Sequence, residues 1–313
     1  MFDKIIGNDE IKNQLNDALK NGRISHAYII SGPDGAGKNL FAEDFAYGLV
    51  GKREGYTPDI VRLVHEKPRT ITVSDIRSQV TGDAQIRPYD AEWKVYIIDD
   101  AQKMNEAAQN ALLKTLEEPP QYVVILLLTT NPNVFLPTIT SRCVSLSLRP
   151  VPDDDITKFL IDNYAIDPNK ASVCASFSQG NVGKAVLLAS SEDFAQIKSS
   201  ACTLAKNARN MDASEFAQAI RQINDYHMDL SDYLDILTVW FRDVLRFKAT
   251  QDANDLIFKD ETMDVKKEAE KSSYAGIEEI ISSIQRAGER LRANVNYDLT
   301  MELLLETIKE NQK

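Results

Sequence analysis

The stretch Gly-Pro-Asp-Gly-Ala-Gly-Lys-Asn at residues 32–39 decides the fold of the first half of this chain. It follows a short apolar run from Ala27 to Ile30, which predicts a strand, and it precedes a helical pattern from Leu40 to Leu49. A glycine-rich turn that ends in lysine between a strand and a helix is a P-loop, whose backbone amides and helix N-terminus bind phosphate. The residues expected to hold the phosphates are Gly32, Gly35, Gly37 and Lys38.

Asn39, the residue after the lysine, departs from the usual P-loop pattern. Ser or Thr normally stands there, and its hydroxyl binds Mg²⁺. The amide oxygen of Asn39 is an alternative ligand for the ion, so this residue is included in the predicted cofactor site. The backbone that cradles phosphate is unaltered whereas the magnesium ligand is changed. The sequence therefore leaves open whether ATP and Mg²⁺ are bound.

Two further apolar runs end in polar residues that belong to the same predicted site. Val95 to Ile98 is followed by Asp99 and Asp100, the Walker B pattern that binds Mg²⁺ and orients the attacking water in P-loop ATPases. Glutamate is usual at the second position, and the shorter Asp100 predicts slow hydrolysis. The run from Tyr122 to Leu128 is followed by Thr130, which we expect to contact the γ-phosphate, although the Asn-Pro beyond it also fits an ordinary turn.

Strand and helix patterns alternate over residues 1–150, and helical patterns alone continue beyond Pro150-Val151-Pro152. The alternation predicts an α/β domain with a parallel sheet, whose strands are buried on both faces because the runs are apolar. The other elements predicted for this half are a helix over residues 9–22, an irregular segment over 51–70, a helix from a cap at Ser74 to about Thr81, and a helix over 105–117.

Composition excludes several classes of protein. The 313 residues carry a formal net charge of −11, which disfavours a chain that binds DNA by itself, because such binding needs clustered Lys and Arg. The three cysteines are far apart, which indicates free thiols. No apolar run approaches the roughly 18 residues of a membrane span, and Met1-Phe2-Asp3-Lys4 is not typical of a signal peptide. We therefore expect a cytoplasmic protein without membrane contact.

Four blocks of sequence resemble the bacterial clamp loaders, the AAA+ assemblies of DNA polymerase III. These blocks are Ile24-Ser25-His26-Ala27-Tyr28, Asn110 to Pro120, Ser141-Arg142-Cys143, and Ala293-Asn294-Val295-Asn296 with the leucines that follow. The second and third together are the most specific. The resemblance spans nearly the whole chain and implies a P-loop AAA+ parallel-sheet domain at 1–150, a small helical lid at 151–207 and an all-α collar domain at 208–313.

The same resemblance implies roles for two further residues and a set of partners. Arg142 is then an arginine finger that acts in trans on ATP bound by a neighbouring subunit, where it stabilises charge on the transferring phosphoryl group. Lys184 takes the position of the lid's second sensor, which is usually arginine. The implied partners are the gamma/tau and delta subunits in a hetero-pentamer, the sliding clamp, and primed DNA, contacted mainly through the complex.

Among these subunits the chain is most similar to the delta-prime type. Asn39 and Asp100 depart from the motor subunit, gamma/tau, and the short C-terminus also favours delta-prime. Thr57-Pro58-Asp59-Ile60 resembles the segment that follows the family's four-cysteine zinc module. No cysteine lies between residues 39 and 92 and His65 stands alone there, so we expect no zinc. The expected function is a stator with weak or no ATPase activity of its own.

Two other functions are weighed against this one. An ATP-hydrolysing gamma/tau motor subunit is the first alternative, against which Asn39 and Asp100 count. A small-molecule P-loop kinase is the second, and it would need a substrate site where this chain has apolar stripes typical of a helical bundle core. Those stripes comprise Leu230, Leu234, Leu237, Phe241 and Leu245 with Trp240 beside them, and Ile277, Ile280, Ile281, Ile284 and Ala287.

Overall fold

The computed structural model describes residues 1–64, 70–191, 193–212, 214–215, 218–219, 221, 230–293 and 295–312. Contacts within the chain define two compact units, which are described one at a time. The first comprises Met1–Phe159 together with Ser178–Lys184, and the second comprises Leu160–Phe177 together with Ala185–Lys313. The division into three domains at residues 150 and 207 stays a prediction.

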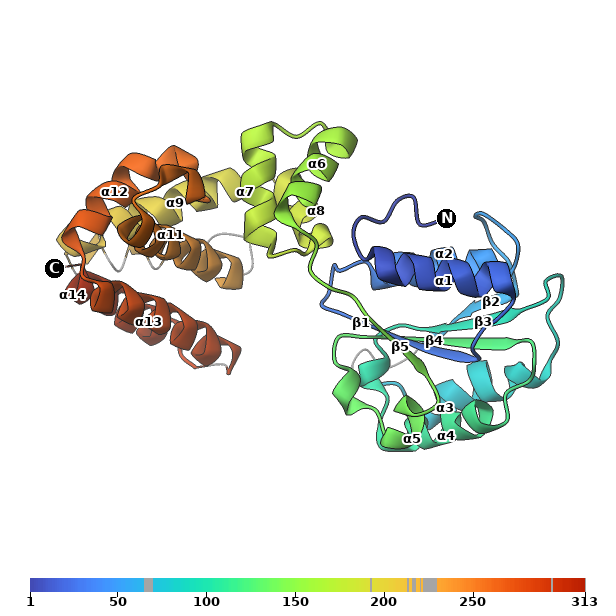
Figure 1. Cartoon of the computed structure of the whole chain (residues 1–313). Coiled ribbons are helices and arrows are strands. Elements are labelled where there is room, and N and C mark those ends of the chain that lie inside the picture. The colour runs from blue at the N-terminus through green and yellow to red at the C-terminus, as the bar shows by residue number, and fades with distance from the viewer. Residues whose placement is uncertain are drawn as a thin grey trace. The chain divides into compact units, whose positions relative to one another are not determined.

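Five parallel strands form the centre of the first unit, in the order β2-β3-β4-β1-β5 (Figure 1). The three central strands are buried along their whole length, as expected for a parallel sheet that is covered on both faces. The predicted α/β fold with a parallel sheet is thereby confirmed. The strands are β1 Ala27–Ser31, β2 Ile60–Arg62, β3 Lys94–Ile98, β4 Val123–Thr129 and β5 Val144–Ser147.

Helices cover the two faces of this sheet (Figure 1). One face packs against α1 Asp9–Asn21 and α2 Lys38–Leu49, and the other against α3 Val73–Ile76, α4 Glu106–Glu117 and α5 Pro137–Thr140. Alternate residues of each central strand belong to opposite cores, because successive side chains of a strand point to opposite faces. The first core contains Tyr28, Ile30, Leu126 and Leu128, and the second contains Ala27, Ile29, Ile125 and Leu127.

Two of the predicted elements in this unit are corrected by the structure. The segment over residues 51–70, expected to be irregular, contains β2, a short strand that pairs with β3 in the register Arg62 opposite Ile97. The helix expected to begin at Ser74 begins instead after Thr72, which forms a capping box with Asp75. Beyond α3 the chain continues as a wider π-helical turn over Arg77–Thr81.

The second unit is built from helices, and no strand occurs among its described residues. Helix α11 is its centre, because α9, α12 and α13 all pack against it and α14 packs against α13. Trp240 and Phe241 of α11 are fully buried, with their rings 4.9 Å apart in an edge-to-face arrangement. The helices beyond the sheet are α6 Asp153–Tyr164, α7 Pro168–Ser178, α8 Val182–Ser190, α9 Asp193–Asn207, α11 Leu230–Thr250, α12 Thr262–Lys271, α13 Tyr274–Arg292 and α14 Tyr297–Asn311.

The apolar stripes predicted from helical spacing lie in this second unit as bundle core. Leu234, Leu237, Ile277, Ile280 and Ile284 are all buried, whereas Leu245 and Ile281 are partly exposed. The side chain of Leu230 and the residues His65 and Asn294, named in the sequence patterns, lie outside the described residues.

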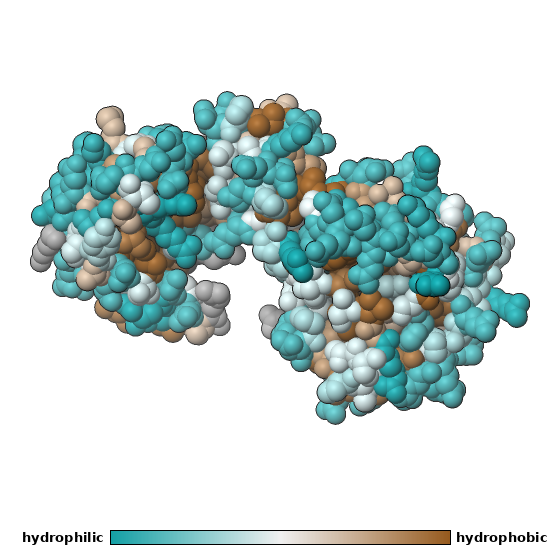
Figure 2. All heavy atoms as spheres, viewed as in Figure 1, coloured by the Kyte–Doolittle hydropathy of each residue, from teal (hydrophilic) through white to brown (hydrophobic). Residues whose placement is uncertain are grey.

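The surface of the first unit is mostly hydrophilic over the outer side of α1, as the amphipathic pattern of that helix predicts (Figure 2). Cys174 and Cys202 are buried, Cys143 is half-buried, and all three are free thiols. In the part of the chain that the structure describes, no helix combines the length and the apolar character needed to cross a membrane.

Candidate nucleotide site

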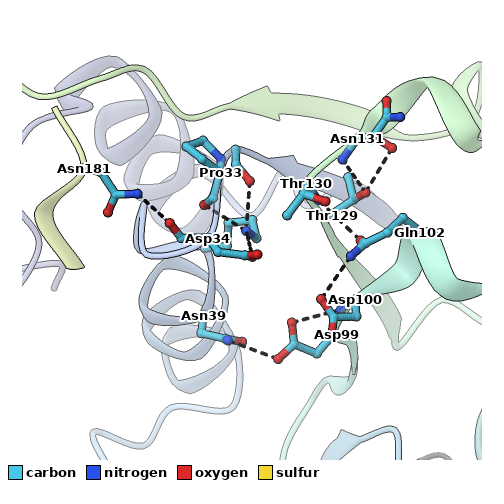
Figure 3. Close-up of polar contacts among 12 residues, drawn as sticks. Pro33, Asp34, Asn39, Asp99, Asp100, Gln102, Thr129, Thr130, Asn131 and Asn181 are labelled. Carbon is cyan, nitrogen blue, oxygen red and sulfur yellow. Dashed lines mark hydrogen bonds and ion pairs between the residues drawn. The ribbon is translucent and has the colours of Figure 1, made fainter. Parts of the chain in front are cut away.

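The carboxyl ends of three neighbouring strands bring the predicted site residues together. The P-loop follows β1, the two aspartates follow β3, and Thr130 follows β4 (Figure 3). Because all strands run parallel, these ends meet at one edge of the sheet, called here the carboxyl edge. The segment 178–184, which lies in the lid according to the sequence analysis, also belongs to the first unit and contacts the P-loop there.

The P-loop has the backbone conformation that its glycines allow. Gly35 and Gly37 adopt φ angles of 81° and 93°, a left-handed region that side chains other than glycine rarely enter. Gly37 is the N-cap of α2, so the positive end of that helix lies directly behind the loop. The amide of Gly32 is already hydrogen-bonded to the carbonyl of Thr129 at 3.1 Å, which ties the loop to the neighbouring strand.

Lys38 is folded back onto the P-loop itself. Its side chain is only 8% exposed, and Nζ donates to the carbonyl of Gly32 at 2.8 Å, to that of Pro33 at 3.0 Å and to Asp34 Oδ1 at 3.2 Å. An ammonium group has three donors, and all three are therefore used within the loop. A phosphate could bind the Lys38 ammonium group only by replacing one of these three hydrogen bonds within the loop.

The oxygens that would hold Mg²⁺ are engaged by an arginine. Asn39 Nδ2 donates to Asp99 Oδ2 at 3.0 Å, and Asn39 Oδ1 accepts from Arg62 at 3.0 Å. The same guanidinium lies 3.7 Å from Asp99 Oδ2 and donates to Glu43 Oε1 at 2.6 Å. A cation already occupies the position between the amide and the carboxylates. The residues present therefore do not fit a magnesium ion in this arrangement.

Asp100, expected to orient the attacking water, is held by its own turn. It adopts a left-handed conformation with φ 48° before the short helix Ala101–Lys103. Its carboxylate pairs with Lys103 Nζ at 2.7 Å and accepts from Gln102 at 3.0 Å. The hydrogen bond from Lys103 is the main cause that holds the pKa of Asp100 below its usual value. A carboxylate so engaged is a weak base for activating water.

Thr130 lies beside the turn that holds Asp100. Its backbone N–H donates to Gln102 Oε1 at 3.3 Å, and the amide of the same glutamine binds Asp100 (Figure 3). Its two neighbours, Thr129 and Asn131, form an ordinary turn, in which the Asn131 N–H donates to Thr129 Oγ1 at 3.0 Å. The end of β4 therefore has the ordinary turn that the sequence allowed, and it also places the polar residue Thr130 at the site.

Residues 181–184 close over the P-loop. Asn181 Nδ2 donates to the carbonyl of Asp34 at 2.5 Å (Figure 3). Its Oδ1 accepts from the N–H of Lys184 at 3.0 Å, so Asn181 is an N-cap of α8. The N–H of Gly183 donates to the carbonyl of Gly35 at 3.0 Å. A Cβ atom at Gly183 would lie 2.7 Å from that carbonyl oxygen, so only glycine permits this approach.

Arg142 is the one predicted site residue that lies at the other edge of the sheet. It stands between α5 and the first residue of β5, and β5 runs parallel to β1 with Val144 opposite Tyr28. The strand β1 has five residues, which at about 3.3 Å per residue separates the two edges by about 13 Å. Arg142 pairs with Glu117 at 3.1 Å and donates to the carbonyl of Thr138 at 2.9 Å.

Sequence reasoning missed Arg62, Asn181 and Glu117. Asn181 directly precedes a helix, and asparagine is among the strongest N-cap residues, so its capping role could have been predicted. Glu117 lies inside a block that was recognised, but nothing local predicts its contact with Arg142. Arg62 carries no signal, because its contacts depend on the pairing of β2 with β3.

Comparisons with known proteins agree with this architecture. A family model described as "DNA polymerase III, delta subunit" matches residues 7–152, and one described as "DNA polymerase III, delta subunit, C terminal" matches residues 192–310. The first model lies within the first unit and the second lies within the second unit. The DNA polymerase III subunit delta' of Bacillus subtilis is 28% identical, over 95% of this chain and 94% of that protein.

Relatives of the tau type match over smaller shares. The tau subunit of Bacillus subtilis is 25% identical over 79% of this chain, and the tau/gamma subunit of Haemophilus influenzae is 33% identical over 51% of it. The chain spans half of the former protein and a quarter of the latter.

Solved structures of the same fold include two from Thermotoga maritima. One is a DNA polymerase III gamma subunit-related protein, with a TM-score of 0.50 and 20% identity, which matches 96% of this chain and all of that one. The other is a RuvB variant with a TM-score of 0.50 and 17% identity, over 80% of this chain and 78% of its own. Both show the AAA+ type of parallel-sheet fold. The two family models and the delta' relative of Bacillus subtilis, which matches nearly the whole of both chains, show the family: the chain belongs to the clamp-loader subunits of DNA polymerase III, and to their delta-prime type.

Proposed function

We propose that this chain supplies an arginine finger to the ATP site of a neighbouring clamp-loader subunit, while its own P-loop site turns over little or no ATP. The observation that carries the proposal is the position of Arg142. This residue lies at the amino edge of the sheet, about 13 Å from the P-loop along β1 by strand geometry. An arginine so placed is remote from phosphates bound by its own chain, and it is suited to act on a second subunit.

The contacts of Arg142 orient its guanidinium and leave part of it available to bind a phosphate of another subunit. Its side chain is 36% exposed, and the guanidinium contacts the Thr138 carbonyl and Glu117. A guanidinium has five N–H donors in a rigid plane, which leaves donors for a phosphate. The side chain of its partner Glu117 is 49% exposed, and ion pairs of such exposure contribute little stability. Exchange of this carboxylate for a phosphoryl oxygen therefore costs little.

The carboxyl edge supports the second half of the proposal. Lys38 is saturated by the P-loop, Asp100 is paired with Lys103, and Arg62 faces Asn39 and Asp99. Each arrangement removes a group that hydrolysis would use. Lys184, expected to be the lid's second sensor, lies in the first turn of α8 beside the P-loop, where it would contact a nucleotide. The proposal concerns hydrolysis and not ATP binding, because the glycines that would cradle phosphate are all present.

The proposal includes partners. We place the chain in a hetero-pentamer with gamma/tau and delta subunits that loads the sliding clamp onto primed DNA in the cytoplasm. The net charge of −11 supports a subunit whose contact with DNA is made mainly through that complex. The collar region at residues 208–313 would join the subunits, and α11, α13 and α14 form the larger part of the bundle there.

The test is the ATPase activity of the reconstituted loader, stimulated by DNA and clamp, with Arg142→Ala in this subunit. Removal of an arginine finger slows hydrolysis at the site that it serves by roughly 10³-fold, so the neighbour's share of turnover should disappear while assembly is retained. Arg149→Ala is the matched control, because Arg149 is an exposed arginine of the same unit in a surface pair with Glu10. Full activity of an assembled Arg142→Ala loader would refute the proposal.

An ATP-hydrolysing role of the gamma/tau type is the alternative, and the 33% identity to the Haemophilus influenzae tau/gamma subunit is the observation in its favour. It predicts steady ATP hydrolysis by the purified chain that Lys38→Ala removes. The delta-prime proposal predicts no such activity.

A further inference from the structure

Asp99 directly follows the strand β3, at the point where a P-loop ATPase places the carboxylate that faces its metal. The neighbouring strand β2 ends in Arg62, and the register sets Arg62 opposite Ile97, two residues before Asp99. Parallel pairing therefore delivers a cationic side chain and an anionic one to the same edge of the sheet. The third participant, α2, begins at the P-loop and presents Asn39 and Glu43 one helical turn apart on one face.

The guanidinium of Arg62 reaches all three of these side chains. It lies 3.0 Å from Asn39 Oδ1, 2.6 Å from Glu43 Oε1 and 3.7 Å from Asp99 Oδ2. The amide of Asn39 also donates to Asp99 at 3.0 Å and so closes the group. Two carboxylates and an amide oxygen are the ligands that a hard divalent cation prefers. Here they surround an organic cation instead.

We infer that Arg62 is a built-in cation that takes the place of the divalent metal and excludes it from Asp99. A guanidinium stays charged at every pH that a protein survives, so this cation is always present. A divalent ion would have to displace Arg62 from Asn39 and Asp99 before it could bind. Any nucleotide held by this P-loop is then held without a bridging metal, through the backbone amides and Lys38.

An ordinary surface ion pair would not have this consequence, and the chain offers one for comparison. Arg286 pairs with Glu279 on α13 at 2.5 Å, and both side chains are 48% exposed. Arg62 and Glu43 have a similar distance and similar exposures of 39% and 45%. The difference is that Arg62 also contacts Asn39 and Asp99, the two positions that a P-loop uses for its metal. The two arginines therefore form a matched pair for an experiment.

The experiment is a titration of the purified chain with Mn²⁺, followed by the electron paramagnetic resonance of the free ion, with and without ADP. Wild type should retain no Mn²⁺ beyond what ADP alone binds. Arg62→Gln leaves Asp99, Glu43 and Asn39 without a cation, and it should bind one Mn²⁺ at least about tenfold more tightly than wild type, because affinity follows the ligand charge. The double variant Arg62→Gln, Asp99→Asn should lose this gain, and Arg286→Gln should behave as wild type.

Two results would overturn the inference. One is a wild-type chain that binds a single Mn²⁺ and loses it with Asp99→Asn, which would mean that Arg62 does not block the site. The other is an Arg62→Gln chain that binds Mn²⁺ no more tightly than wild type in either nucleotide condition. Circular dichroism confirms that each variant is folded. Both results concern the isolated chain, so they leave the arginine-finger proposal, which is tested in the assembled loader, to succeed or fail separately.

Discussion

The charged groups at the two edges of the parallel sheet differ in how far they are paired within the chain. At the carboxyl edge the charged groups are matched within the chain, Lys38 by the P-loop, Asp100 by Lys103, and Asp99 with Glu43 by Arg62. At the amino edge the partners of Arg142 among the described residues are an exposed carboxylate, a backbone carbonyl and a neighbouring hydroxyl. The first edge has the form of an ATPase site and is satisfied internally, whereas the second presents a cation to the surroundings.

This difference separates two functions that an ATPase subunit normally combines. A motor subunit uses the carboxyl edge for its own nucleotide and the amino edge for its neighbour's. Under the proposed function, the contacts at the carboxyl edge weaken the first use, and Arg142 preserves the second. A stator of this kind would retain the fold of a motor and lose its chemistry, since a few side chains that pair with each other are enough to occupy the site. The predictions that follow test this asymmetry.

The largest contrast is expected between Lys38→Ala and Arg142→Ala in the reconstituted loader. The lysine variant removes contacts that the P-loop makes with itself, so DNA- and clamp-stimulated ATPase should stay at the wild-type rate. The arginine variant should lose the neighbour's turnover, for the reason given above. The measurement is the steady-state rate of phosphate release at equal amounts of assembled loader. A loss with Lys38→Ala as severe as that with Arg142→Ala would erase the contrast between the edges.

Asp59→Asn should destabilise the amino edge. Asp59 directly precedes β2 and is 1% exposed, and its carboxylate accepts the N–H groups of Tyr89, Asp90 and Ala91 at 2.5, 2.9 and 3.0 Å. An asparagine side chain keeps one acceptor and turns an N–H toward these donors. We expect a loss of about 2–3 kcal/mol in the free energy of unfolding, measured with urea. Asp90→Asn, on the exposed side of the same loop, is the control and should change little.

The pH dependence of this loss has a definite sign. Burial alone would raise the pKa of Asp59, but the three N–H donors, assisted by Lys52, hold it below its usual value. A carboxyl with a lower pKa in the folded state stabilises above its unfolded pKa of about 3.9, and that stabilisation is lost as the pH falls through the folded pKa. The advantage of wild type over Asp59→Asn should therefore be complete near neutrality and shrink below about pH 4. An advantage that grows in acid would contradict the assignment.

A smaller effect is expected when the closure of the P-loop is opened by Gly183→Ala. The added Cβ would lie 2.7 Å from Gly35 O and 2.8 Å from Gly35 Cα, both of them backbone atoms that cannot rotate away. Alanine improves helix propensity by up to about 1 kcal/mol, yet we expect a net loss of about 1–2 kcal/mol because the segment must shift. Hydrogen exchange of residues 32–38 should accelerate. Ser190→Ala, at the other end of α8, should leave it unchanged, and equal protection in Gly183→Ala would show that the contact is weak.

Much of the sheet could be predicted from the sequence because its signals are local. Apolar runs predict the strands β1, β3 and β4. The glycines directly after β1 predict the turn that leads into the helix α2. The strand β2 was missed because it has three residues, none of them fully buried. The cap at Thr72 was missed because Thr72 and Ser74 are both good caps, and the reciprocal contact with Asp75 decides between them.

The site could be predicted as a set of residues but not as a set of contacts. The P-loop and the Asp99-Asp100 pair are recognised by spacing, and parallel topology then places them together. That Lys38 folds onto its own loop, or that Arg62 faces Asp99, depends on side-chain directions and on strand register. No local pattern encodes these. The same holds for Asn181, whose partner Asp34 is 147 residues away in the sequence.

The outer strands of the sheet have a consequence for how the protein behaves among many other chains. An open strand edge can pair with another polypeptide and begin aggregation. Here β2 has three residues and ends in Arg62. The strand β5 has four and is followed by Leu148, Arg149 and Pro150, and the proline has no N–H to donate to a further strand. Such short, charged borders discourage strand addition. We therefore expect that any partners of this protein are recognised through its side chains and helices rather than by strand addition.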